Sequence, residues 1–205
     1  MQLVKLTPHI YYSEPERETD RPVLGYIAGE KRAVMVDAGN SGAHYEAYRA
    51  LLRASGLRMP EVCVITHWHW DHTFGIHALE QECVAQVNTN QKLREMASWE
   101  WSDAAMKERL RQGIEIPYAD TCIRAEYEDV TDIRVVPART EMQERLDLDC
   151  GGITCRCMHL PSAHSEDSVV VYVQEEKILF IGDIYGDDWY QGKRDLDKTR
   201  ALYQA

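Results

Sequence analysis

The sequence lacks the long apolar segments that mark membrane-spanning and secreted proteins. No apolar run approaches the roughly 18 residues that a bilayer-spanning helix needs, and the longest runs, at 169–173 and 178–181, have the length of a strand. The first residues contain one lysine, but neither an apolar stretch of about 7–15 residues nor a cleavage site of small residues follows. We therefore expect a soluble, cytoplasmic protein with no membrane partner.

The chain also has no excess of basic over acidic residues. Lysine and arginine number 23 against 34 aspartates and glutamates, which gives a formal net charge of -11. Because phosphate binding depends on a basic surface, this balance excludes nucleic acid as an expected partner and favours a small-molecule substrate.

Repeats, proline-rich linkers and low-complexity tracts are absent as well. The 205 residues, of which 44% are hydrophobic and 28% charged, have the balance of an ordinary globular protein, so we expect one domain over residues 1–205. The six cysteines are even in number, but without a secretory signal in a chain of this length they are expected to be reduced thiols.

Strand-like and helix-like segments alternate along the chain. Apolar runs and turn residues predict strands at 23–28, 33–36, 62–65, 153–159, 168–173 and 178–181, with turns at 29–32 and 174–177. Helical spacing and capping residues predict helices between Ser41 and Gly56 and at 90–97, 103–113 and 195–205. Strands with helices interspersed indicate an α/β layered architecture.

The most informative segment directly follows the predicted strand at 62–65. It holds His67, His69, Asp71 and His72, which are three imidazoles and a carboxylate within six residues. Nitrogen and oxygen ligands of this kind suit a borderline metal such as zinc. In an extended chain His67 and His69 project to the same side, and a turn can bring Asp71 and His72 to a neighbouring position, so the loop suits two metals. A histidine-rich surface loop without a ligand role is the alternative.

Two later residues add to this pattern. His164 lies in a turn between two predicted strands, where functional side chains are commonly presented. Asp183 follows the apolar run at 178–181, and a charge at the end of a buried strand costs free energy unless it is paired or bound to a cation.

In order and approximate spacing, these residues resemble the metal-site signature of the metallo-β-lactamase superfamily. The resemblance covers about residues 20–185, and the segment from Asp37 to Gly39 is similar to the family's early Asp-x-Gly turn. The resemblance implies an α/β fold, the four-layer αβ/βα sandwich, in which two mixed β-sheets pack face to face with helices outside. The metals would then lie at one edge of the sheets.

The same resemblance implies a role for each residue. The first metal would be held by His67, His69 and His164, the second by Asp71 and His72, and both by the bridging Asp183. The cofactors would be two divalent ions, zinc first, with iron or manganese as alternatives. A metal-bound hydroxide would be the nucleophile, because a metal lowers the pKa of its bound water to about 7, and Asp71 would be the catalytic residue that accepts or relays the proton. Asp37 would order the ligand loop, with a turn-capping role as an equal alternative.

The sequence departs from the family after Asp183. The family usually adds one more histidine to the second metal, but only 22 residues follow Asp183 and none of them is a histidine. We expect that the chain lacks the C-terminal elements of the fold and that the second metal site is incomplete for this reason.

Other candidate residues carry less weight. Cys155, Cys157 and His159 share one face of a predicted strand and would form a metal site only if they were not core residues, which is the commoner role of cysteine. Three histidines without a partner in the sequence are expected at the surface: His9, His44 and His77. Five aromatic residues flank the ligand segments and would either line a substrate pocket or serve as packing: Trp68, Trp70, Tyr185, Trp189 and Tyr190.

The first functional hypothesis is a metal-dependent hydrolase acting on a small ester, lactone, thioester or amide. A nuclease of the same superfamily fits poorly with the net charge of -11, and β-lactamase activity is not favoured, because the familiar zinc class has a cysteine ligand at about the position of Asp183 and no cysteine follows His164. The di-iron oxidoreductases of the superfamily resemble this chain less, because they carry a carboxylate at the position of His69.

Two alternatives stay open. A mononuclear non-haem iron dioxygenase of the same fold would use two histidines and one carboxylate, His67, His164 and Asp183. A catalytically weak metal-binding protein would have an incomplete second site as its real state.

Overall fold

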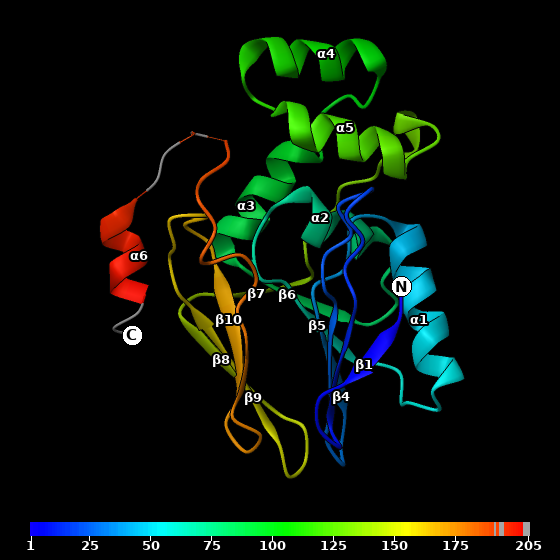
Figure 1. The fold of residues 1–205 in the computed structure, drawn as a ribbon, viewed down its shortest axis with the longest axis vertical. Helices are drawn as coiled ribbons and strands as arrows, with labels where there is room; N and C mark the ends of the chain where they lie inside the picture. The colour runs from blue at the N-terminus through cyan, green and yellow to red at the C-terminus, as the bar shows by residue number, and fades with distance from the viewer. Residues whose placement is uncertain (191, 193–194, 203–205) are drawn as a thin grey trace.

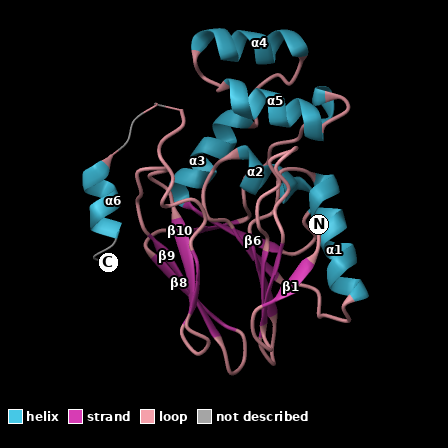
Figure 2. Cartoon of the chain, viewed as in Figure 1, coloured by secondary structure: helices cyan, strands magenta, loops and turns pink. Residues whose placement is uncertain are grey.

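Two β-sheets lie face to face in the computed structural model, which describes residues 1–190, 192 and 195–202 (Figure 1, Figure 2). The first sheet has seven strands in chain order: β1 (Leu3–Lys5), β2 (Ile10–Ser13), β3 (Gly25–Ala28), β4 (Ala33–Val36), β5 (Val62–Val64), β6 (Glu82–Gln86) and β7 (Thr140–Met142). The second has four in the order β11-β10-β9-β8: β8 (Arg145–Asp149), β9 (Thr154–His159), β10 (Val169–Val173) and β11 (Ile178–Phe180). The expected α/β sandwich is therefore present.

Strand directions differ between the two sheets. In the first sheet β1 to β4 are antiparallel neighbours, whereas β4 to β7 pair in parallel, so this sheet is mixed. The second sheet is antiparallel at each described pairing, so the expectation of two mixed sheets needs correction. Short connections explain the difference, because parallel neighbours need a crossover of a dozen or more residues and the connection at 174–177 is a tight turn.

Helices cover the outer faces and one end of the sandwich. They are α1 (Gly42–Ala54), α2 (Trp70–Thr73), α3 (Val87–Met96), α4 (Asp103–Gln112), α5 (Pro117–Glu126) and α6 (Leu196–Leu202), with short 3₁₀ helices at Phe74–Ala78 and Val130–Asp132. Figure 1 shows α1 beside the first sheet, α6 beside the second, and α4 and α5 together at one end. Each described helix is too short or too polar to cross a bilayer.

Most predicted elements are confirmed within two or three residues. Helix α1 begins after Ser41, whose hydroxyl accepts a hydrogen bond of 2.9 Å from the backbone N–H of His44, and Gly56 beyond its end has a left-handed φ of 66°. The end of the helix predicted at 195–205 lies outside the described residues. The sequence pattern does not predict the strands β1, β2, β6, β7 and β8 or the helix α5.

Alternate residues of the central strands face two different cores. Val34 and Val36 of β4 belong to the cluster between the sheets, together with Cys157 of β9, whereas Met35 between them packs in the cluster beneath α1 with Tyr48. This is the period of two that a strand buried on both faces requires. Cys155 and Cys157 are fully buried, which confirms them as core residues, and all six cysteines are free and buried.

Candidate metal centre

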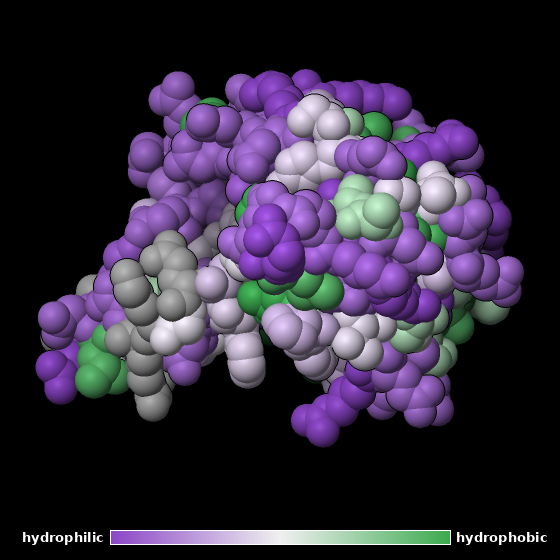
Figure 3. Space-filling view, turned by 90° about the horizontal axis from the view of Figure 1, so that it is seen from above, coloured by the Kyte–Doolittle hydropathy of each residue, from purple (hydrophilic) through white to green (hydrophobic). Residues whose placement is uncertain are grey.

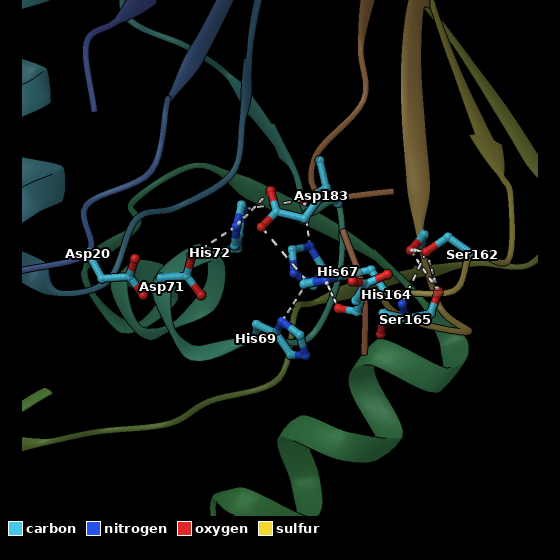
Figure 4. A network of polar contacts seen from close by, with 12 residues as sticks. Asp20, His67, His69, Asp71, His72, Ser162, His164, Ser165 and Asp183 are labelled. Atoms are coloured by element: carbon cyan, nitrogen blue, oxygen red, sulfur yellow. Dashed lines mark hydrogen bonds and ion pairs between the residues drawn. The ribbon is translucent and has the colours of Figure 1, made fainter. Parts of the chain in front are cut away.

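Three chain segments meet at one edge of the two sheets and bring the predicted ligands together (Figure 4). The segment after β5 carries His67 and His69 and continues into α2, which carries Asp71 and His72. The connection between β9 and β10 supplies one further histidine, and the segment after β11 supplies one aspartate: His164 and Asp183.

The three histidines expected to hold a first metal form a tight cluster. Ligand nitrogens of His67, His69 and His164 lie within 4.8 Å of one another, and all three side chains are buried. The ring centroid of His67 is 4.5 Å from that of His69 and 5.0 Å from that of His164. The Nδ1 of His69 lies 2.9 Å from the Nε2 of His164, so these two nitrogens face each other.

Electrostatics keep part of this cluster neutral. Burial and the neighbouring ring of His164 lower the pKa of His69 to about 3. Burial, with the rings of His72 and His69, also lowers the pKa of His67 well below its ordinary value. Both imidazoles are therefore uncharged at neutral pH, which is the form that donates a lone pair to a metal.

The buried Nε2 of His67 provides a test of whether the residues fit a metal ion. The His67 side chain is almost fully buried, and its Nε2 has no hydrogen-bond partner among the described residues. A buried polar atom without a partner costs free energy, so native structures rarely contain one. A divalent ion among the three facing imidazoles would satisfy this atom, and the donor set is one that zinc prefers.

A second group of ligands shares His67 with the first. It consists of His67, His72 and Asp183, again with ligand atoms within 4.8 Å. The carboxylate of Asp183 has one oxygen 3.7 Å from the Nε2 of His72 and the other 3.8 Å from the Nε2 of His164. Asp183 therefore lies between the two groups, which is the position that a bridging role requires, although the role itself stays a prediction.

Asp71 joins the site through its neighbour. Its Oδ2 lies 3.0 Å from the Nε2 of His72. Burial alone would lower the pKa of His72, but the carboxylates of Asp71 and Asp37 outweigh it and raise that pKa well above its ordinary value. Without a metal, His72 is thus a cation held between two carboxylates.

Asp37 holds this part of the site in place from behind. Its Oδ2 accepts a hydrogen bond of 2.8 Å from the Nδ1 of His72, and its Oδ1 accepts one of 2.7 Å from the backbone N–H of Thr66. The hydroxyl of Thr66 also donates to Asp37 and lies 3.1 Å from the Nδ1 of His67. Contacts of this kind fix the orientation of ligand imidazoles, and they support the loop-ordering interpretation of Asp37 over a simple turn cap.

The histidines expected to have no ligand role lie away from the cluster, with one correction. His9 and His77 are exposed, as predicted. His44 was expected at the surface but is fully buried. Its ring packs so closely against Gly39 that a Cβ added at Gly39 would lie 2.6 Å from the Nδ1 of His44. His159 bonds to the backbone carbonyl of Glu166 at 2.8 Å.

A residue that the sequence did not indicate faces the site. Asp20 lies beside Asp71 in Figure 4 and accepts a hydrogen bond of 3.0 Å from the hydroxyl of Tyr118. Burial and the charge of Asp71 raise the pKa of Asp20 to about 6. No local signal could have identified it, because these contacts join residues far apart in the sequence.

A cavity of about 580 Å³ opens on the histidine cluster. The lining residues are Arg17, Asp20, His69, Trp70, Asp71, Ile116, Tyr118, Ala119, His164, Asp183, Trp189 and Tyr190. Of the five aromatic residues that flank the ligand segments, three thus line this cavity: Trp70, Trp189 and Tyr190. Trp68 packs against Tyr190 instead, with ring centroids 5.1 Å apart, and Tyr185 does not line the cavity.

Comparison with known proteins agrees with this geometry. The family model described as the metallo-beta-lactamase superfamily matches residues 21–187. A chicken (Gallus gallus) protein named acyl-coenzyme A thioesterase MBLAC2 is 30% identical over 186 residues, which cover 83% of this chain and 61% of that protein. The chain therefore spans less than two thirds of this curated relative.

Solved structures share the fold at low identity. A variant of a metallo-β-lactamase from Cronobacter sakazakii superposes with a TM-score of 0.65 at 16% identity, covering 100% of this chain and 75% of the other. A class B3 di-zinc metallo-β-lactamase from an Alaskan soil metagenome gives a TM-score of 0.57 at 11% identity, covering 84% of this chain and 57% of the other. At these identities the likeness shows the fold alone.

Proposed function

Since the chain belongs to the metallo-β-lactamase superfamily, we propose that it is a metal-dependent hydrolase of small acyl compounds, with thioesters as the first substrate class. The observation that carries the proposal is the cluster of three buried histidines, two of them held neutral, with carboxylates beside them in the lining of a cavity. Such a donor set beside an open space is typical of catalytic rather than structural metal sites.

The residues would divide the work as follows. Zinc at the first position would be held by His67, His69 and His164, and a second ion by Asp71 and His72, with Asp183 shared. Bound zinc supplies Lewis-acid polarisation of the substrate carbonyl and lowers the pKa of a water to about 7. Asp71 borders the cavity and would accept a proton from a water there.

Two metals are proposed rather than one. A second group of facing ligand atoms, from His67, His72 and Asp183, supports a second ion beside the first. Asp71 is outside that group and contacts it through His72, whose ring is oriented by Asp37. The soil-metagenome enzyme of the same fold is named as a di-zinc protein. Zinc is the first choice because imidazole and carboxylate donors in a small cluster suit it.

The relative named as a thioesterase supports thioesters over the other acyl compounds. A small-molecule substrate also agrees with the net charge of -11, which would repel nucleic acid. β-Lactams stay disfavoured by the aspartate at position 183. The cytoplasmic location stays a prediction.

The dioxygenase alternative receives less support. It needs two histidines and one carboxylate with the remaining positions open. Here His69 is a third imidazole, whose Nδ1 lies 2.9 Å from the Nε2 of His164, and it would occupy one of those positions.

Metal analysis and a substrate panel test the proposal. The protein dialysed against zinc should retain the metal and hydrolyse thioesters faster than β-lactams, and His67→Ala combined with His164→Ala should abolish both. A double variant that kept stoichiometric zinc after dialysis would contradict the ligand assignment. A zinc-loaded wild type that hydrolysed no ester, lactone, thioester or amide would leave the weak metal-binding protein as the better conclusion.

A further inference from the structure

The cavity beside the histidine cluster is lined by two chemically different groups of side chains, which we call its metal end and its apolar end. His69, Asp71, His164 and Asp183 form one end. The other end consists of apolar and aromatic side chains from the start of α5 and from the segment before residue 191: Ile116, Tyr118, Ala119, Trp189 and Tyr190. Its volume of about 580 Å³ is in the range of small-molecule sites, which are commonly apolar with a few polar groups at one point.

Large apolar side chains at the mouth of this cavity are exposed. Tyr118 is 54% exposed and Trp189 is 66% exposed. Figure 3 views the end of the molecule where α4 and α5 lie and shows that this face is mostly hydrophilic, with tyrosine and tryptophan in pale colours on its hydropathy scale. Exposed apolar groups that converge on a hollow indicate a binding site more often than they indicate imperfect packing.

The inner wall of the apolar end is held in place by a buried carboxylate. The hydroxyl of Tyr190 donates a hydrogen bond of 3.0 Å to Glu115, which also accepts one of 2.9 Å from the backbone N–H of Ile116. The ring of Tyr190 packs against His69, with centroids 5.2 Å apart. The wall is therefore tied both to the beginning of α5 and to the metal cluster, so little ordering is needed when a ligand enters.

We propose that this apolar end binds the acyl group of the substrate and that Tyr118 and Trp189 determine which chain lengths are accepted. The inference rests on the proposed hydrolase function, since the reacting carbonyl must lie at the metal end. The opposite orientation, with a phosphate-bearing leaving group in the cavity, is unfavourable. Arg17 is the one cationic side chain in the lining, against the carboxylates of Asp20, Asp71 and Asp183.

A chain-length series with the zinc-loaded protein provides the first test. The substrates are straight-chain acyl thioesters of one small thiol, from acetyl to decanoyl. In the wild type kcat/KM should rise about fourfold for each added methylene until the cavity is filled. The ratio of decanoyl to acetyl kcat/KM should fall roughly tenfold or more in Tyr118→Ala and in Trp189→Ala. The matched control is Ile114→Ala, because Ile114 is exposed near α5 but does not line the cavity, and it should keep the wild-type ratio.

A binding measurement without metal separates this inference from the proposed function. The neutral dye N-phenyl-1-naphthylamine is added to zinc-free protein and displaced by straight-chain alcohols. Displacement should strengthen with chain length in the wild type and in Ile114→Ala, and much less in Tyr118→Ala and Trp189→Ala.

The outcomes distinguish the two claims. Hydrolysis with a flat chain-length profile, or a profile that both cavity variants leave unchanged, overturns the acyl site but not the hydrolase. Chain-length-dependent displacement without hydrolysis of any thioester overturns the hydrolase and retains an apolar ligand site.

Discussion

Acidification should destabilise the metal-free protein through His69. Burial and the adjacent His164 lower the pKa of His69 to about 3, whereas its ordinary value is 6.5. Between these two pH values the unfolded chain binds a proton that the folded protein does not, so the free energy of unfolding decreases as the pH falls. Above pH 6.5 neither state carries the proton, and the contribution is constant.

The magnitude follows from this window. Each pH unit within it changes the free energy of unfolding by about 1.4 kcal/mol for one group, so a change from pH 6.5 to 5.0 costs about 2 kcal/mol. His72 has a raised pKa, and its contribution has the opposite sign. That stabilisation is fully present below pH 6.5 and is lost only as the pH rises through the folded pKa, so it does not affect the slope between pH 6 and 5.

Urea unfolding in the presence of a chelator, from pH 5.0 to 7.5, measures the effect. His69→Asn should flatten the slope below pH 6.5 by about 1.4 kcal/mol per unit relative to the wild type. The readout is the slope of the unfolding free energy against pH. The substitution also removes contacts of the His69 ring, but that loss shifts the free energy by the same amount at every pH. Asn88→Ala, at an exposed side chain that carries no titratable group, is the control and should keep the wild-type slope. Parallel pH profiles for wild type and His69→Asn would refute the reasoning.

Two further predictions concern the carboxylates of the site. Asp37→Asn should lower zinc affinity about 10–100-fold in a chelator competition, because it disturbs the bonds that orient His72 and Thr66; unchanged affinity would exclude a positioning role. Asp183→Asn should lower thioester hydrolysis roughly 100-fold or more. In the metal-free form, the free energy of unfolding of Asp183→Asn should stay within about 0.5 kcal/mol of the wild-type value, since the Asp183 side chain is 46% exposed. Equal activity in this variant and the wild type would remove Asp183 from the site.

The sequence could predict which histidines and carboxylates come together at one edge of the sheets, but not the residues that shape their surroundings. His67, His69 and His72 are close in the chain, so spacing alone places them in one loop. Asp20 and Tyr118 lie 98 residues apart, and their hydrogen bond depends on how α5 packs against the loop before β3. Such a contact leaves no pattern in the sequence.

The missed elements of the fold have a similar explanation. Strands β1 and β7 have three residues each, which is too short for an alternation to be recognised. Helix α5 begins with Pro117, a good first residue, but Ile116 before it offers no capping side chain. The strand directions of the second sheet depend on connection lengths, and the mixed sheet that the family resemblance implied there is wrong, since each described pairing is antiparallel.

Thr66 explains why the cluster assembles where the two sheets meet. Its carbonyl accepts a hydrogen bond of 2.7 Å from the backbone N–H of Val169, the first residue of β10, while its N–H and hydroxyl bind Asp37. Gly182 approaches Thr66 so closely that an added Cβ would lie 2.8 Å from its hydroxyl oxygen, and its φ of 52° favours glycine.

These contacts give the two ends of the cavity different origins. The metal end is fixed by hydrogen bonds and close approaches between strand ends of both sheets. The apolar end comes from α5 and the segment at 189–190. Tyr190 packs against His69, and Tyr118 donates a hydrogen bond to Asp20. Because the start of α5 contributes none of the expected ligands, we expect substitutions there to alter substrate choice and leave zinc affinity unchanged, which the thioester series and the chelator competition measure independently.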